Sequence, residues 1–149
     1  AGMTTTAAEC VLCVQDGGAL IWRGEKLRLI RAVEEGFPAF YRVIWNAHAA
    51  ELSDLSDDDR NLCMRAVAAV ERVLRDTLAP TKINLAALGN MVPHLHWHVI
   101  ARFDWDSHFP ASVWANAQRP RNADKEAAVA AQLSLLDAQL AERLSAQFG

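Results

Sequence analysis

Three of the chain's five histidines occupy alternate positions in the short sequence HLHWH, residues 94–98. Alternate side chains of a β-strand share one face of the sheet, so His94, His96 and His98 are expected to point the same way. Packing explains such a row poorly, because burial removes the hydration of the imidazoles and protonation makes them repel one another. Two kinds of chemistry suit it: metal chelation, and nucleophilic catalysis by one neutral imidazole assisted by its neighbours. Spacing alone does not choose between them.

A second group with chemical potential is the pair Cys10-x2-Cys13, whose spacing is typical of a metal-binding knuckle. A disulfide is not expected, because the chain has an odd, small number of cysteines and no sign of an oxidising compartment. A redox pair would need the start of a helix, which the turn Asp16-Gly17-Gly18 interrupts. A Zn²⁺ ion would need two further ligands. Cys63 lies within an apparent helix and is interpreted as a small buried apolar residue.

Composition excludes several classes of protein. The chain has 149 residues, enough for one domain with a core, and a net charge of −3, so a nucleic-acid partner is not expected. A small anionic ligand is compatible with this charge. No apolar run approaches the ~20 residues that span a bilayer, and the start of the sequence does not resemble a signal peptide, so we expect no membrane association and a cytoplasmic location.

Hydrophobic periodicity predicts the elements that position these groups. Ser56 is a suitable N-cap for a long amphipathic helix that ends before Pro80, and a second apolar stripe predicts a C-terminal helix from Asp124 to about Phe148. The paired residues Gly17-Gly18 indicate a turn. Short runs rich in β-branched and aromatic residues predict five strands: Ala19–Trp22, Leu27–Ala32, Phe40–Trp45, Ile83–Leu88 and His94–Arg102.

The segment His94–Ile100 resembles the signature of the histidine triad (HIT) family, His-φ-His-φ-His-φ-φ with φ apolar. Upstream, Gly89-Asn90-x-Val92-x-His94 is similar to the family's Gly-Gln-x-Val-x-His. Val43-Ile44-x-x-x-His48 is similar to its second strand. The resemblance covers about residues 10–102 and includes a bacterial branch that carries a C-x2-C pair near the N-terminus.

The resemblance implies an α+β fold: a single HIT-like domain over residues 3–149, with an antiparallel sheet of about five strands packed by one long helix. Residues 103–149 would add an irregular tail and a C-terminal helix. It also implies a homodimer that binds nucleotides and cleaves or transfers at the α-phosphate through the triad His94, His96 and His98. His96 inherits the role of nucleophile, and neutral imidazole suits that role because it attacks an anionic phosphate without charge repulsion. His98 would bind the α-phosphate and help to protonate the leaving group.

Other site residues are implied by the same comparison. Asn90 and the backbone of the loop that starts at Gly89 would cradle phosphate, with Asn84 as a further candidate. Glu34 or Glu35 lies in the loop expected to hold the ribose, although a solvated glutamate is an equal alternative. For the base, the candidates are apolar residues of a kind that is more often plain core: Ile21, Trp22, Leu27 and Leu29.

In HIT proteins that bind zinc, the ligands correspond to Cys10, Cys13, His48 and His94 here. Four protein ligands complete a tetrahedron, so the ion would be structural. The chain also departs from the family pattern, since Asn90 replaces a glutamine and Met91 stands where a hydroxyl residue is common. These departures leave the substrate open.

Three classes of function follow. The first is a nucleotide hydrolase or nucleotidyl transferase, acting for example on dinucleoside polyphosphates or phosphoramidates. The second is a nucleotide sensor that retains the triad without turnover. The third is a metal-centred oxygenase or lyase with all three histidines on one ion, which leaves the cysteine pair unexplained. We further expect the stretch from Asp106 to Trp114 to fold over the phosphate end of the site and influence the leaving group.

Overall fold

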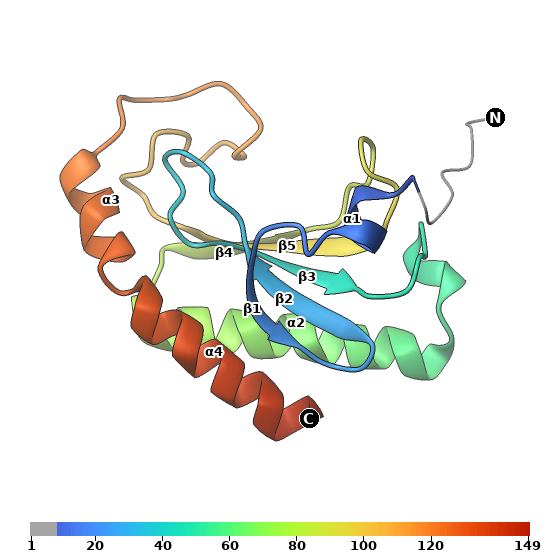
Figure 1. Ribbon diagram of the computed structural model, residues 1–149. Coiled ribbons are helices and arrows are strands. Elements are labelled where there is room, and N and C mark those ends of the chain that lie inside the picture. Colours follow the sequence, from blue (N-terminus) through green and yellow to red (C-terminus); the bar gives the residue numbers. More distant parts are fainter. Residues whose placement is uncertain (1–8) are drawn as a thin grey trace.

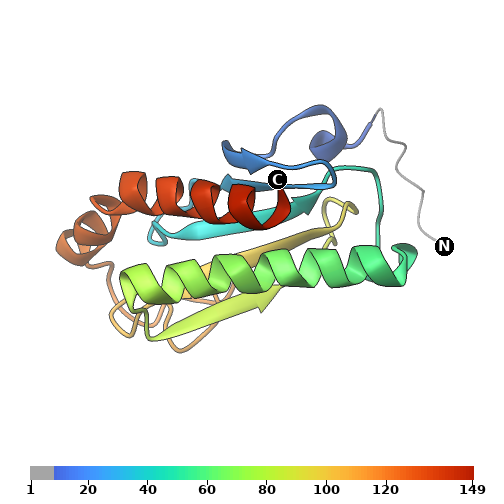
Figure 2. The same ribbon diagram turned by 90° about the horizontal axis from the view of Figure 1, so that it is seen from below.

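A computed structural model describes residues 9–149, so residues 3–8 of the predicted domain lie outside the described part. Five antiparallel strands form one sheet in the order β1-β2-β3-β5-β4, with helices α2 and α4 packed on one face (Figures 1 and 2). The α+β architecture expected from the sequence is therefore confirmed. The strands are β1 (Ala19–Arg23), β2 (Leu27–Arg31), β3 (Phe40–Trp45), β4 (Lys82–Ala86) and β5 (His96–Arg102).

The long helix α2 (Asp57–Leu78) forms where the sequence predicts it. The Ser56 side chain accepts a hydrogen bond from the backbone N–H of Asp59 at 3.2 Å, and three aspartates in the first turn interact favourably with the helix dipole. The helix ends at Ala79, which adopts a left-handed conformation (φ 46°) just before Pro80. Its buried side chains lie against the sheet: Cys63, Ala66, Val67, Ala69, Val70, Val73 and Leu74.

The two faces of the sheet differ in what covers them. On the helix-covered face, Leu29, Tyr41, Val43 and Val99 are at most 2% exposed and form the main core. The opposite face carries the side chains of His96 and His98. It is covered by a short helix, α1 (Val11–Val14), and by irregular segments (Figure 1). Alternation along the strands thus separates packing residues from residues available for chemistry.

The sequence predicts that the last strand begins at His94, but strand β5 begins at His96. The backbone turns before the strand: His94 N–H bonds the carbonyl of Val92, and Leu95 N–H bonds the carbonyl of Ala49. His94 therefore lies before the strand, whereas His96 and His98 lie within it and pair with β3. Strand β4 is also displaced, ending at Ala86 instead of Leu88.

The predicted single C-terminal helix is wrong in one respect, because it is divided into α3 (Ala123–Ala130) and α4 (Leu133–Phe148). Ala131 and Gln132 separate the two, where the backbone N–H of Gln132 bonds the carbonyl three residues back, at Val129. The break redirects the chain so that α4 lies along α2 and strand β1 (Figure 2). No glycine or proline marks the position in the sequence.

Polar contacts fix α4 on the sheet. The carboxylate of Asp137 accepts hydrogen bonds from Tyr41 Oη at 2.6 Å and from Arg31 Nη2 at 3.1 Å. Thr77 of α2 donates to Gln139 at 2.8 Å. None of the helices between residues 9 and 149 is both long and apolar enough to cross a bilayer.

Leu140 and Leu135 allow the packing of α4 to be tested with a matched pair. Leu140 is fully buried, so Leu140→Ala should lower the free energy of unfolding by about 2–5 kcal/mol. Leu135 is 61% exposed on the same helix, so Leu135→Ala should change it by less than about 0.5 kcal/mol. Urea unfolding of both variants checks this expectation, and equal effects would show that α4 does not pack on the core.

Candidate active site and metal centre

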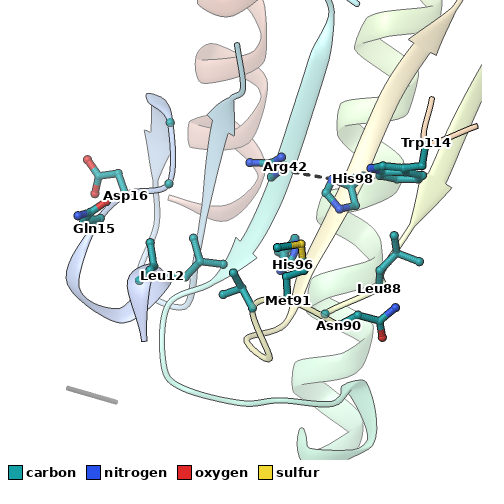
Figure 3. Close-up of a pocket in the computed structure, with 15 residues that line it drawn as sticks. Leu12, Gln15, Asp16, Arg42, Leu88, Asn90, Met91, His96, His98 and Trp114 are labelled. Carbon is teal, nitrogen blue, oxygen red and sulfur yellow. Dashed lines mark hydrogen bonds between the residues drawn. The ribbon is translucent and has the colours of Figure 1, made fainter. Parts of the chain in front are cut away.

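A cavity of about 780 Å³ opens on the face of the sheet that carries the triad (Figure 3). Its walls come from α1 and the turn after it, from strands β3 and β5, from the loop that precedes the triad, and from one residue of the C-terminal tail. The lining residues are Val11, Leu12, Gln15, Asp16, Gly17, Gly18, Arg42, Leu88, Gly89, Asn90, Met91, Val92, His96, His98 and Trp114.

His96 presents one ring nitrogen to this cavity. Its Nδ1 lies 2.6 Å from the carbonyl oxygen of His94. A carbonyl oxygen only accepts, so Nδ1 carries the proton and Nε2 keeps its lone pair. Burial, and to a lesser degree the positive charge of Arg42, lower the pKa of His96, while the bond to the carbonyl acts against them. A neutral ring with a free Nε2 is suited to nucleophilic attack.

His98 lies beside His96, with ring centroids 5.0 Å apart, and is only 5% exposed. Its ring also makes edge contacts with Phe40 and with Trp114. The guanidinium Nε of Arg42 donates to His98 Nδ1 at 3.3 Å (Figure 3). Burial, followed by the charges of His96 and Arg42, lowers the pKa of His98 to about 4. His98 is therefore uncharged at neutral pH.

His94 serves a different centre. The possible ligand atoms of Cys10, Cys13, His48 and His94 lie within 4.8 Å of one another. His94 Nδ1 is 3.3 Å from Cys10 Sγ and 3.4 Å from Cys13 Sγ, and His48 Nδ1 is 3.3 Å from Cys13 Sγ. A tetrahedral ion with bonds of ~2.0–2.3 Å separates its ligand atoms by about 3.5 Å, so the spacing fits zinc.

The tautomer of His94 also fits a metal ligand. Its Nε2 lies 2.5 Å from the carbonyl oxygen of Trp45, which fixes the proton on Nε2 and leaves the Nδ1 lone pair directed at the two sulfur atoms. The metal-competent cluster contains neither His96 nor His98, so within residues 9–149 the three histidines do not converge on one ion. The side chain of His94 thus belongs to the cysteine cluster, and the cavity is lined by His96 and His98.

Helix α1 joins the cysteine cluster to the cavity. Cys10 precedes the helix and Cys13 lies within it, both in the metal-competent cluster, whereas Val11 and Leu12 line the cavity. The buried side chain of Arg28 holds this region by donating to the carbonyl oxygens of Leu12 at 2.5 Å, Asp16 at 3.0 Å and Gln15 at 3.1 Å. One buried guanidinium thus positions a whole wall of the cavity.

Gly17 closes the same wall. Its φ of +96° favours glycine, and an added Cβ would lie 2.7 Å from a methyl group of Leu12. The turn predicted at Gly17-Gly18 is therefore confirmed.

The loop that precedes the triad lies where the sequence comparison places it. Gly89 and Asn90 both line the cavity, and the side chains of Asn90 and Met91 are exposed. Met91 is 95% exposed, so it offers an apolar side chain where many HIT proteins carry a hydroxyl. The amide of Asn90 is free to turn toward a ligand in the cavity.

Three other predicted residues are not brought into the cavity. Asn84 accepts a hydrogen bond from Arg102 Nη1 at 2.8 Å and supports the tail instead. Glu34 lies 3.5 Å from Arg42 Nη2, and Glu35 lies 3.7 Å from Arg121 and is largely exposed. Residues proposed as an apolar base pocket also lie elsewhere, since Trp22, Leu27 and Leu29 are core residues on the helix-covered face and Ile21 packs against them.

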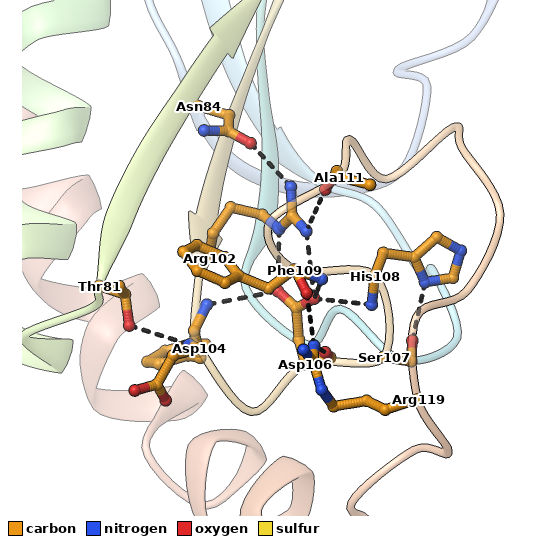
Figure 4. A network of polar contacts seen from close by, with 11 residues as sticks. Thr81, Asn84, Arg102, Asp104, Asp106, Ser107, His108, Phe109, Ala111 and Arg119 are labelled. Carbon is orange, nitrogen blue, oxygen red and sulfur yellow. Dashed lines mark hydrogen bonds and ion pairs between the residues drawn. The ribbon is translucent and has the colours of Figure 1, made fainter.

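The tail after the triad is anchored by a buried ion pair. Arg102 Nε donates to Asp106 Oδ2 at 2.8 Å, and both side chains are about 2% exposed (Figure 4). Asp106 Oδ1 also accepts from the backbone N–H groups of His108 and Phe109, which folds the chain back on itself. This fold brings Trp114 against His98, with centroids 5.1 Å apart. The stretch from Asp106 to Trp114 therefore does reach the triad.

Reasoning from the sequence missed four residues that shape the site: Arg42, Arg28, Val11 and Leu12. Both arginines lie within predicted strands, at positions that alternate with apolar core residues. A charged residue in such a position signals a buried or site-facing role. Val11 and Leu12 lie between the two cysteines, where the metal-binding spacing is the only pattern and gives no role to the residues inside it.

The lowered pKa of His98 leads to a prediction for stability. The unfolded chain binds a proton at this residue below pH ~6.5, whereas the folded chain does so only near pH 4. The free energy of unfolding should therefore decrease as the pH falls through this window, by about 3 kcal/mol at pH 4 from His98 alone. Urea unfolding of the parent and of His98→Asn between pH 7 and 4 measures the difference, and parallel curves would contradict the assignment.

Comparison with known proteins agrees with this geometry. The HIT domain model matches residues 16–105, more than half of the chain. A histidine triad protein from Bradyrhizobium japonicum is 25% identical with a TM-score of 0.66, over 82% of this chain and 92% of that one. One from Sinorhizobium meliloti is also 25% identical with a TM-score of 0.64, over 80% and 90%.

A zinc-bound histidine triad family protein from Mycobacterium smegmatis shares the fold, with a TM-score of 0.59 at 20% identity, over 90% of this chain and 99% of that one. Among proteins with curated functional descriptions, none matches. Because the domain model spans the sheet, the triad and the loop before it, the chain belongs to the histidine triad family.

Proposed function

We propose that this protein is a nucleotide hydrolase or nucleotidyl transferase that acts at the α-phosphate through a covalent intermediate on His96. The observation that carries this proposal is that His96 lines the cavity while its Nδ1 is held by the carbonyl of His94, which leaves Nε2 as the nitrogen with a lone pair. Membership of the family supports a nucleotide as the ligand, as does the name of a structural relative from Sulfolobus tokodaii, a hypothetical histidine triad nucleotide-binding protein.

The reaction proceeds in two steps. The Nε2 lone pair of His96 forms a bond to the α-phosphorus, the bond from phosphorus to the leaving group breaks, and its electron pair departs with that group. Water or another acceptor then attacks the same phosphorus. The P–N bond breaks, and its electron pair returns to Nε2 of His96. Two displacements replace one difficult attack of water on an anionic phosphate.

The cavity offers a place for each part of a nucleotide. Val11 and Leu12 form an apolar wall on the α1 side that suits a base, in place of the core residues proposed from the sequence. Backbone N–H groups of the loop from Gly89, the Asn90 amide and His98 suit the phosphate. Arg42 supplies a fixed positive charge between these two regions (Figure 3).

His96→Asn should remove turnover, because an amide cannot form the phosphorus–nitrogen bond. We expect the rate of release of the nucleoside monophosphate to fall on the order of 10³-fold or more, with binding of AMP retained. His108→Asn is the matched control, since His108 does not line the cavity. Intact-protein mass spectrometry during turnover should show a nucleotidyl adduct in the parent and none in His96→Asn.

The alternative is a nucleotide sensor without turnover. The replacement of the usual phosphate-contacting hydroxyl by Met91 favours it. The two functions separate in the same experiment. A parent protein that binds AMP as tightly as His96→Asn, yet releases no product from any nucleoside phosphate ester or phosphoramidate, would establish the sensor.

We also propose that Cys10, Cys13, His48 and His94 hold a structural Zn²⁺ ion. The donor set, the ligand spacing and the fixed tautomer of His94 support it, and the zinc-bound relative from Mycobacterium smegmatis has the same fold. Four protein ligands leave no open position, so the ion would brace α1 and supply no chemistry to the reaction.

Removal of one ligand tests this centre. Cys13→Ser should lose the zinc that elemental analysis finds at one ion per parent chain, and its midpoint of thermal unfolding should fall. Cys63→Ala is the matched control, because Cys63 is buried in α2 far from the cluster in sequence and should retain the metal. A parent protein purified with added zinc that contains none would contradict the proposal.

A cytoplasmic homodimer is proposed as the working form. Strand β4 is an edge of the sheet, and Leu85 on that strand is 41% exposed. An edge strand with an exposed apolar side chain is a ready surface for pairing with a second copy. Light scattering gives the mass in solution directly.

A further inference from the structure

We propose that Arg42 locks His98 as a neutral hydrogen-bond donor, which restricts the enzyme to leaving groups that depart as stable anions, such as phosphates or carboxylates. This inference rests on the proposed function and deepens it by naming the class of leaving group. It also revises the role expected for His98, which would bind the departing group without giving up a proton.

The geometry of the two strands carries the first step. Arg42 on β3 and His98 on β5 are direct partners in the antiparallel register, and both face the cavity. Arg42 Nε lies 3.3 Å from His98 Nδ1. An arginine Nε always carries a hydrogen, so His98 Nδ1 must accept. The single proton of the neutral ring is therefore on Nε2.

The surroundings of His98 oppose a second proton. A hydrogen on Nδ1 would point at the Nε–H of Arg42, a repulsive arrangement of two donors. The ring is 5% exposed and is enclosed by Phe40, Trp114 and the neutral ring of His96. Within residues 9–149, no carboxylate forms a hydrogen bond or ion pair with His98, and the nearby Glu34 contacts the outer side of Arg42 at 3.5 Å. The low pKa of His98 agrees with this environment.

The consequence concerns the balance of protons in the first displacement. Loss of the Nε2 proton would turn neutral His98 into an imidazolate anion, so the ring can donate a hydrogen bond but cannot complete a transfer. The leaving atom must then keep the electron pair as a negative charge. Phosphate and carboxylate oxygens do so readily, since their acids have pKa values of about 6 and 4. Alkoxides and amide anions do not, so alcohols and amines are poor leaving groups here.

Arg42 fits this class of leaving group for a second reason. Arg42 lines the cavity, and its side chain is 24% exposed. A permanent positive charge therefore lies beside His98. This charge attracts the negative charge that accumulates as the bond to phosphorus breaks.

A series of aryl esters of AMP tests the inference, with phenols ranging from strongly acidic nitrophenols to phenol itself (pKa about 10). The single-turnover rate should fall from the most acidic phenol to the least acidic one. In the parent, which lacks general-acid assistance, this fall should be about 10²–10⁴-fold larger than in a variant whose His98 can donate a proton to the phenol. Arg42→Met is that variant, and its rates should depend less on the acidity of the phenol. Arg42→Lys retains the charge without the Nε donor, so its dependence should resemble that of Arg42→Met.

Nitrogen NMR of the histidine rings gives a readout that does not depend on turnover. In the parent, His98 should carry its proton on Nε2 from pH 7 down to about pH 5, and in Arg42→Met it should titrate at higher pH. A flat dependence on the phenol, or a protonated His98 in the parent at pH 6, would overturn the inference and leave the proposed function intact. Failure to cleave any ester, with the expected tautomer present, would instead count against the proposed function and with it the leaving-group assignment.

Discussion

The hydrogen bond from His96 to the carbonyl oxygen of His94 determines what this site can do. It joins two residues of the same segment, so it forms whenever the backbone turns at His94 before entering β5. The bond fixes which nitrogen of His96 faces the cavity and prevents the ring from rotating away. Because the His94 side chain lies at the cysteines, one local conformation separates the proposed nucleophile from a metal-competent residue only two positions away.

The segment from Cys10 to Gly18 joins the metal-competent cluster to the wall of the cavity. The four-residue helix α1 begins directly after Cys10 and contains Cys13, so the two thiols lie beside His48 and His94 while Val11 and Leu12 line the cavity. Arg28 completes the arrangement from strand β2 by satisfying three carbonyl groups that α1 and the following turn leave unpaired. The wall of the cavity is thus held from two independent sides.

Much of this architecture is readable in the sequence. The N-cap at Ser56, the strand Phe40–Trp45 and the pair Cys10 and Cys13 lie where local patterns and motif spacing place them, whereas His48 and His94 joined this pair only through the resemblance to the family. These features depend on short-range rules: a cap, a period of two, or a pair of cysteines. The resemblance to the family added the positions of Gly89 and Asn90, which spacing alone could not have assigned.

What the sequence did not reveal depends on pairing between distant segments. The contact of Arg42 with His98 depends on the register between β3 and β5. Asn84 is held away from the cavity because it bonds Arg102 on the adjacent strand. The division of the C-terminal helix has the same origin. Ala131 and Gln132 are compatible with helix, and tertiary packing of Val129 and Leu133 accompanies the change of direction.

The buried pair of Arg102 and Asp106 has a consequence for how related proteins can diversify. It fixes the start of an irregular segment outside the part of the chain that the family model matches, yet Trp114 near the middle of that segment touches the triad. Insertions or substitutions between Asp106 and Trp114 would therefore alter one wall of the cavity while the sheet and the rings of His96 and His98 keep their positions. A short segment that is tied down at its base lets the shape of a pocket change independently of the strands beneath it.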